Sequence, residues 1–196
     1  FESYYSSDSA TNFSTQVTVN NIQVALMAFA TGILACIPTV LLLAYNGVNV
    51  GVAAGMFADA GELDRFFGLI LPHGLLELTA VTIAGAAGLR VGWAVIAPGD
   101  RSRAEALGTE ARRAVLIALG LMVAFVVAGF IEGFVTGRGV PTALRIAIGV
   151  AAELAFVLWI VVQGRTATAR GLTGEMGELD RGWDELAAAR ERAWAR

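Results

Sequence analysis

The sequence contains no lysine, one cysteine and one histidine among 196 residues. All 14 basic residues are arginine, and the first of them is Arg65. A single cysteine excludes a disulfide framework and any cysteine-rich zinc or iron–sulfur site. The net charge of −3 and the absence of a basic run exclude a nucleic-acid-binding protein. No P-loop, G-x-G-x-x-G or G-x-S-x-G motif occurs, so these common enzyme signatures are absent as well.

Charged residues are also scarce, at 16%, whereas 56% of residues are hydrophobic and the mean hydropathy is +0.65. Soluble domains usually have about 25% charged and ~45–50% apolar residues. A long stretch without basic residues, followed by arginine clusters, is typical of the charge bias of membrane topology. The composition therefore predicts an all-α, polytopic transmembrane helical bundle.

Three segments are long and apolar enough to cross a bilayer, which takes about 20 residues. They cover residues 75–97, 114–134 and 142–163. A short apolar piece precedes Pro72, and we expect the helix to break there, with the piece lying at the interface or re-entering. Residues 22–58 form either one kinked crossing with a re-entrant stretch or two short crossings that turn near Pro38. We favour two crossings, because residues 1–16 contain no arginine and are expected outside.

The arginines also predict the orientation. Residues 98–113 and the tail after residue 163 are rich in arginine and are separated by two crossings, so the positive-inside rule places both in the cytoplasm. We therefore divide the chain into an extracytoplasmic segment (1–21), a transmembrane bundle (22–163) and a cytoplasmic tail (164–196). Because the chain starts with Phe1 and has no secretory leader, we expect a mature or truncated part of a longer protein.

The tail shows the spacing of an amphipathic helix. Apolar residues recur there with heptad spacing at Leu172, Met176, Leu179, Trp183 and Leu186. This pattern predicts a helix that lies on the protein or on the membrane surface, or that pairs in a short coiled coil.

Small residues recur once per helical turn in three segments. They are Gly47, Gly51 and Gly55 in the first region, Ala84, Gly88 and Gly92 in the segment 75–97, and Gly129 and Gly133 in the segment 114–134. In lipid, small residues let helix backbones approach and gain dispersion contacts. The spacing predicts close helix contacts, either within the chain or between two copies.

Ionisable residues interrupt the apolar segments. They are His73, Glu77, Glu132, Arg145 and Glu153. A charge at the bilayer centre costs ~2.5–3.5 kcal/mol on insertion scales, so such side chains face the bundle interior and find partners. His73 and Glu77 are four residues apart and share a helix face. Since Glu132 and Arg145 lie near the outer ends of their segments, we expect these four side chains to meet in the outer third of the membrane.

Two further groups of polar residues are predicted at greater depth. Glu153 follows Arg145 by eight residues, which places it roughly 12 Å deeper. Asn46 and Asn49 are expected to add an amide pair near mid-depth if residues 22–58 form a hairpin.

Three interpretations of the polar residues stay open. A buried network in which Arg145 neutralises Glu132 or Glu77 would fix the helix register, with His73 orienting the carboxylate. A transport or proton-relay site would use the same groups to carry ions or protons. A metal-dependent intramembrane hydrolase would use histidine and glutamate as ligands, although a single histidine leaves such a site rich in oxygen.

Several stretches resemble the stage II sporulation protein M family of integral membrane proteins. They are Asn20 and Asn21, the Ile-Pro-Thr at 37–39, the Asn-Gly stretch at 46–55, LPHGLLELTAVTIAGAAGLRVG at 71–92 and AGFIEGFVT at 128–136. The resemblance covers about residues 17–163, and Pro72, His73, Gly74, Glu77 and Glu132 match its motifs. Family members carry a spanning segment before this point, and this sequence does not show one.

The resemblance implies a self-associating helical bundle in the bacterial plasma membrane. In endospore formers the family's namesake works with peptidoglycan-remodelling partners at the sporulation septum, as an anchor or scaffold. We therefore expect a non-enzymatic scaffold without cofactor or metal, with the lipid bilayer, a second copy and envelope proteins as partners. A transporter or channel is the alternative, and a metal-dependent hydrolase the second alternative.

Overall fold

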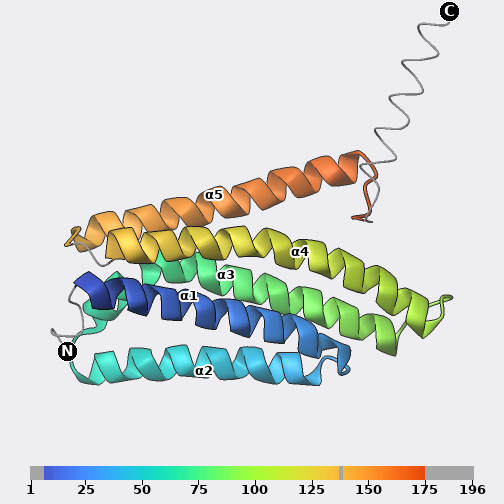
Figure 1. Cartoon of the computed structure of the whole chain (residues 1–196), viewed down its shortest axis with the longest axis horizontal. Helices are drawn as coiled ribbons and strands as arrows, with labels where there is room; N and C mark the ends of the chain where they lie inside the picture. Colours follow the sequence, from blue (N-terminus) through green and yellow to red (C-terminus); the bar gives the residue numbers. More distant parts are fainter. Residues whose placement is uncertain (1–6, 137–138, 175–196) are drawn as a thin grey trace, which may run out of the picture.

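The computed structural model describes residues 7–136 and 139–174, with side chains from Val19 onward. Every regular element in this part is a helix (Figure 1). The elements are α1 (Ser7–Ala30), the 3₁₀ turn η2 (Thr31–Ile33), α2 (Ile37–Asp59), α3 (Leu63–Ile96), α4 (Arg103–Ile131), the π-helical turn η3 (Glu132–Thr136) and α5 (Thr142–Ala169). The chain is therefore an all-helical bundle, as the composition predicts.

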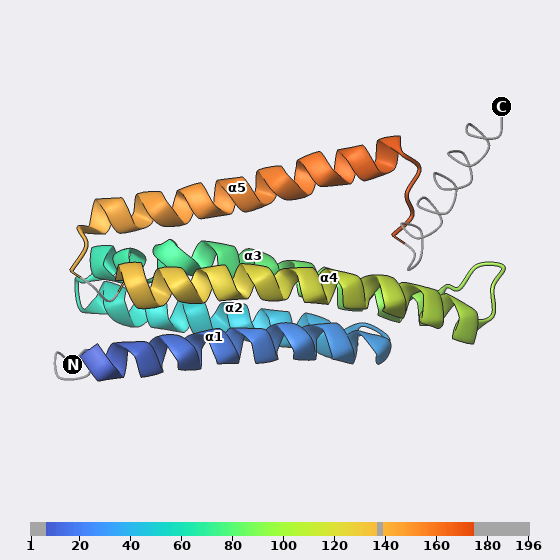
Figure 2. The same ribbon diagram turned by 45° about the horizontal axis from the view of Figure 1, so that its top comes forward.

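Four of these helices are long and apolar enough to cross a membrane. They cover 37–59, 63–96, 103–136 and 142–169, and α1 contributes a shorter apolar stretch, Val19–Ile33. Consecutive helices run in opposite directions (Figure 1). The start of α1 and the α2–α3 and α4–α5 links lie at one end, which we call the cluster end. The α1–α2 turn, the α3–α4 link and the end of α5 lie at the other, the arginine end (Figures 1 and 2).

Helix α3 is the centre of the bundle and contacts α1, α2, α4 and α5. The core between α1, α3 and α4 consists mainly of alanines around a few larger side chains, among them Leu76, Leu121 and Phe125. Small side chains bring helix backbones close together where lipid removes the hydrophobic drive for association. In contrast, α2 buries only Thr39 and α5 only Gly149, so both helices present most of their apolar surface outward.

The chain reverses direction between η2 and α2, in agreement with the two-segment alternative for residues 22–58. Ala35 and Cys36 adopt positive φ angles of 54° and 70°, which are strained for residues with a Cβ. Thr39 is fully buried and donates a hydrogen bond to the Ala28 carbonyl at 2.7 Å, and the Cys36 thiol donates to the Leu89 carbonyl at 3.3 Å. These bonds fasten the strained turn to α1 and α3.

The predicted break at Pro72 is wrong, because α3 continues through it from Leu63 to Ile96. A proline inside a helix removes one hydrogen bond and costs about 3 kcal/mol in an exposed helix. Here Pro72 is buried by neighbouring helices, and such packing makes proline tolerable in membrane helices. The apolar piece before Pro72 is thus the first part of α3.

The helices extend beyond the predicted crossings at several ends. The α1 helix already begins at Ser7, α4 at Arg103, and α5 continues to Ala169. Apolar runs locate only the part of a helix that lipid would cover, whereas polar turns can extend it. Of the heptad positions in the tail, Leu172 follows α5 and is exposed. The other four, Met176, Leu179, Trp183 and Leu186, lie outside the described residues.

Candidate functional site

A buried polar cluster lies near the cluster end, where three helical elements meet. His73 and Glu77 project from α3, one helical turn apart, and are 5% and 3% exposed. Glu132 comes from η3 at the end of α4 and is 6% exposed. Asn21 reaches the cluster from α1. Residues from three parts of the chain thus form one polar site inside an apolar bundle.

The contacts of the cluster centre on the two carboxylates. Nδ1 of His73 lies directly against Oε2 of Glu132. Asn21 Nδ2 donates a hydrogen bond to Glu77 Oε2 at 2.5 Å. The other oxygen of Glu77, Oε1, has no hydrogen-bond partner among the described residues. The cluster therefore holds α1, α3 and η3 together and keeps one buried acceptor available.

The turn η3 is where α4 widens from α-helical to π-helical hydrogen bonding. Such turns accommodate an additional residue in a helix and are frequent at functional sites. Glu132 and Thr136, at the two ends of this turn, are both buried. The widened turn therefore presents its first and last side chains to the bundle.

Arg145 does not neutralise Glu132 or Glu77, contrary to the prediction. Its Nη1 donates to the Thr136 carbonyl at 3.2 Å and its Nη2 to the Thr142 hydroxyl at 3.0 Å. The arginine thus satisfies a carbonyl at the end of η3 and ties it to the start of α5. A free backbone carbonyl at a helix end attracts a cation for the same reason that a carboxylate does.

The deeper polar residues stand apart from this cluster. Glu153 accepts a hydrogen bond from the Thr79 hydroxyl at 2.7 Å, which joins α5 to α3. Asn46 and Asn49 lie in the middle of α2 but do not belong to a buried cluster, because Asn49 is exposed and Asn46 half-buried. Neither makes a described hydrogen bond to the cluster; the amide that does so is Asn21 of α1.

Pro72, next to His73, lies at the contact between α3 and α5. A Cβ on Gly149 would lie 2.5 Å from the Pro72 carbonyl oxygen, so only glycine lets α5 pack there. Gly74 is buried, and a Cβ on it would meet the Ile70 side chain at 2.9 Å. Pro72 and Gly74 thus shape the surface of α3 beside the cluster rather than adding polar groups to it.

The two best-described stripes of small residues differ in what they contact. Ala84 is buried in the core, and added Cβ atoms on Gly88 and Gly92 would lie 2.5 Å and 2.1 Å from carbonyl oxygens of α1 and η2. This stripe packs within the chain. The stripe on α2, formed by Gly47, Gly51 and Gly55, packs against none of the described residues, because a Cβ at each position would meet no described atom within 4 Å.

A second polar group, which the sequence patterns do not predict, lies toward the arginine end. Glu110 of α4 is buried and accepts hydrogen bonds from Arg90 Nε at 3.2 Å and Arg113 Nη1 at 3.0 Å. Arg90 interrupts an apolar segment and could have been noticed on that ground. Glu110 precedes the apolar run of α4, so no pattern marked it as buried.

Among the described residues, no group of three or more His, Cys, Asp or Glu side chains is arranged to hold a metal ion. His73 faces Glu132 directly, and Glu77 turns one oxygen toward Asn21. The arrangement supports side-chain pairing across helices. It does not provide the ligand set on which a metal-dependent hydrolase would depend.

The fold and the buried cluster define a polytopic α-helical membrane protein. Residues 1–137 match the family described as stage II sporulation protein M, and the chain belongs to this family. An uncharacterized protein of Methanocaldococcus jannaschii is 30% identical over 124 residues, which are 62% of this chain and 70% of that protein. No solved structure matches the chain significantly. The predicted resemblance is thereby confirmed up to residue 137, and α5 lies beyond the match.

Proposed function

We propose that this protein is a non-enzymatic scaffold of the bacterial plasma membrane that anchors or organises envelope-remodelling partners. The main support is that the side chains of the polar cluster are buried and contact one another across helices. His73, Glu77 and Glu132 are each at most 6% exposed and are engaged by side chains from another element. A buried network of this kind fixes helix register and orientation. The cluster then serves the rigidity of a platform rather than a reaction.

The platform offers its partners the outward surface of α2. This helix buries only Thr39 and exposes Tyr45, Val48, Val52 and Met56 beside its glycine stripe. In membranes, stripes of small residues allow one helix to pack closely against another. We place a second copy of the chain, or a spanning helix of an envelope protein, on this surface.

We further propose that the arginine end faces the cytoplasm. Arg101 and Arg103 lie at the α3–α4 link, and Arg165 and Arg170 near the end of α5, all at this end. Short loops rich in arginine remain on the cytoplasmic side of bacterial membranes. Ser102→Cys in a Cys36→Ser background should resist an impermeant thiol reagent in intact cells and react after lysis. Labelling in intact cells would reverse the orientation.

The scaffold role is tested by placing a photo-crosslinking residue at Val52 of α2 in living cells. A scaffold should give crosslinks to peptidoglycan-remodelling proteins or their membrane anchors, identified by mass spectrometry. The matched control carries the crosslinker at Trp159, which is similarly exposed on α5. Crosslinks to lipid alone at Val52 would contradict the proposal.

A transporter is the second candidate, because Glu77 Oε1 lacks a hydrogen-bond partner among the described residues. Buried carboxylates without full partners occur in ion and proton pathways. Glu77→Gln separates the two functions. In a scaffold the variant loses stability or assembly, and liposomes loaded with a pH-sensitive dye show no proton flux from either protein. In a transporter the wild-type protein carries a flux that Glu77→Gln abolishes while the fold survives.

A further inference from the structure

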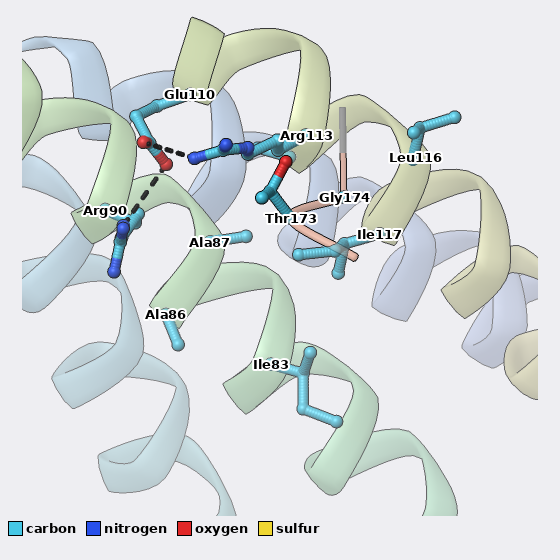
Figure 3. A pocket seen from close by; sticks show the side chains of 11 residues that line it. Ile83, Ala86, Ala87, Arg90, Glu110, Arg113, Leu116, Ile117, Thr173 and Gly174 are labelled. Carbon is cyan, nitrogen blue, oxygen red and sulfur yellow. Dashed lines mark hydrogen bonds and ion pairs between the residues drawn. The ribbon is translucent and has the colours of Figure 1, made fainter. Parts of the chain in front are cut away.

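Several polar side chains within the apolar helices pair with a side chain of another helix. Thr79 of α3 donates a hydrogen bond to Glu153 of α5 at 2.7 Å. Arg90 of α3 donates to Glu110 of α4 beside a pocket of about 500 Å³ (Figure 3). Asn49 of α2 is an exception, because it is exposed and its side chain makes no hydrogen bond with a described residue.

Asn49 lies in the middle of a helix that is long enough to cross a membrane. It follows Ile37, the first residue of α2, by 12 residues and precedes Asp59, the last, by ten. At 1.5 Å per residue, roughly 15–18 Å of helix lie on either side of it, which is about half of a bilayer core. An amide without a hydrogen-bond partner is costly at this depth. Asn49 therefore requires a polar partner outside the described residues.

Asn49 belongs to a row of exposed side chains with the spacing of a coiled coil. Tyr45, Asn49, Val52 and Met56, which we call the Asn49 seam, follow one another at intervals of four, three and four residues and share one face of α2. Tyr45, Val52 and Met56 are 68%, 57% and 69% exposed. Figure 1 shows α2 at the edge of the bundle. The seam is thus open to a helix that approaches from outside.

A second copy of the chain supplies a polar partner at the right depth. Copies inserted in one membrane have the same orientation, so their α2 helices run parallel. A two-fold axis along the membrane normal then places Asn49 of one copy opposite the partner's Asn49. Because an amide contains both donors and an acceptor, the two side chains satisfy each other. In parallel coiled coils, a single asparagine in the seam fixes the register and the number of strands.

We infer that α2 pairs with α2 of a second copy through the Asn49 seam. The two Asn49 amides bond to each other near the middle of the bilayer, and Tyr45, Val52 and Met56 pack around them. Gly51 lies about 160° around the helix from Asn49, so the glycine stripe faces another side and stays open to a further helix. The inference rests on the proposed function only in treating the outward surface of α2 as a contact surface.

Disulfide formation tests whether the seams of two copies are in contact. In a Cys36→Ser background, Met56→Cys places a thiol in the seam, near the cluster end of α2, and leaves Asn49 unchanged. Leu144→Cys is the matched control, because Leu144 lies near the same end of α5 and is 52% exposed. Mild oxidation in liposomes should link two copies of the Met56→Cys protein and leave the Leu144→Cys protein monomeric. Equal yields of linked dimer would overturn the inference.

A second experiment tests the amide pair itself. Asn49→Leu keeps a side chain of similar size but removes the hydrogen bonds. It should weaken the association of copies about 3- to 30-fold, the range for a hydrogen bond between membrane helices, as measured by energy transfer over a dilution series in liposomes. Asn49→Gln retains an amide and should keep most of the association. Because Asn49 is exposed, both variants should unfold like the wild-type monomer. Unchanged association of Asn49→Leu would also overturn the inference.

These results are separable from the test of the scaffold role. Photo-crosslinks from Val52 to envelope proteins, without a disulfide in the Met56→Cys protein, would support the scaffold and exclude the pair. The disulfide without such crosslinks would support the pair and contradict the scaffold. Gly51→Leu changes the glycine stripe and should leave the Met56→Cys disulfide intact. Loss of that disulfide would place the contact between copies on the stripe and overturn its assignment to the Asn49 seam.

Discussion

His73 of α3 and Glu132 of η3 are in direct contact inside the bundle, and each side chain is 6% exposed. The contact joins the central helix to the π-helical turn that ends α4. Because both groups are removed from water, each depends on the other to satisfy its polar atoms. This pair is therefore the natural place to measure how much the polar cluster contributes to stability.

Glu132→Ala should lower the free energy of unfolding by about 1–3 kcal/mol, the usual cost of leaving a buried polar group, here the His73 ring, without its partner. Unfolding in mixed micelles, followed by circular dichroism, measures the change. Glu105→Ala removes an exposed acid from the same helix and should cost less than about 1 kcal/mol. Equal effects of the two substitutions would show that the buried contact does not stabilise the bundle.

Gly88→Ala should destabilise the bundle by about 1–3 kcal/mol, as overpacking of a tight interior does. A Cβ at this position would lie 2.5 Å from the Ala28 carbonyl oxygen and 2.8 Å from that of Phe29, and backbone atoms cannot move aside. Gly120→Ala is the matched control, because a Cβ on that glycine of α4 meets no described atom within 4 Å. It should leave stability unchanged or raise it by up to about 1 kcal/mol through helix propensity.

Gly51→Leu should reduce self-association and leave the folded monomer intact. The position is open within the described chain, so a larger side chain disturbs only what packs on α2 from outside. Energy transfer between labelled copies in liposomes measures association, and the unfolding curve measures the monomer. Unchanged energy transfer would mean that copies of the chain do not associate through this face of α2. Loss of monomer stability would mean that the glycine stripe of α2 packs within the chain after all.

Ala35→Gly should stabilise the protein by about 1 kcal/mol, because the residue has a φ of 54° that glycine adopts without strain. The side chain is exposed, so little packing is lost. Ala60→Gly provides the opposite case, since Ala60 is exposed but has a φ of −80°. That substitution should destabilise slightly, through the greater freedom of glycine in the unfolded chain. The midpoints of thermal unfolding should therefore move in opposite directions.

Arg145→Gln should cost about 1–2 kcal/mol, because the arginine donates to a carbonyl and a hydroxyl rather than to a carboxylate. An ion pair with buried Glu132 would instead give a loss of about 3–5 kcal/mol. The double variant Arg145→Gln with Glu132→Gln discriminates further, since independent sites have additive effects. A double variant more stable than either single variant would support an ion pair between Arg145 and Glu132.

The helices could be predicted from the sequence because long apolar runs have few alternatives in a membrane. The start of α5 at Thr142 and the reversal before Pro38 follow from such runs. The continuation of α3 through Pro72 could not be predicted. Local propensity favours a break at proline, and the packing of Gly149 against it becomes visible only in three dimensions.

The burial of the candidate site could be predicted from the sequence. Exposing His73, Glu77 or Glu132 to lipid costs free energy, so their place in apolar segments predicts that they face the bundle interior. The residues with which they pair could not be predicted. Asn21 provides a hydrogen bond to Glu77, for which the sequence predicts a charged partner, and Arg145 binds a carbonyl. Neutral partners such as amides and carbonyls carry no signature in a sequence, because every chain has many of them.

The one-sided attachment of α2 has a practical consequence. Since Thr39 is its only buried residue, most of the surface of this helix is covered by the detergent or lipid around the protein. A micelle of short-chain detergent, a nanodisc and a native bilayer will each cover its glycine stripe differently. Unfolding free energies from different solubilisation media will accordingly disagree for this protein, and the disagreement will be concentrated in α2.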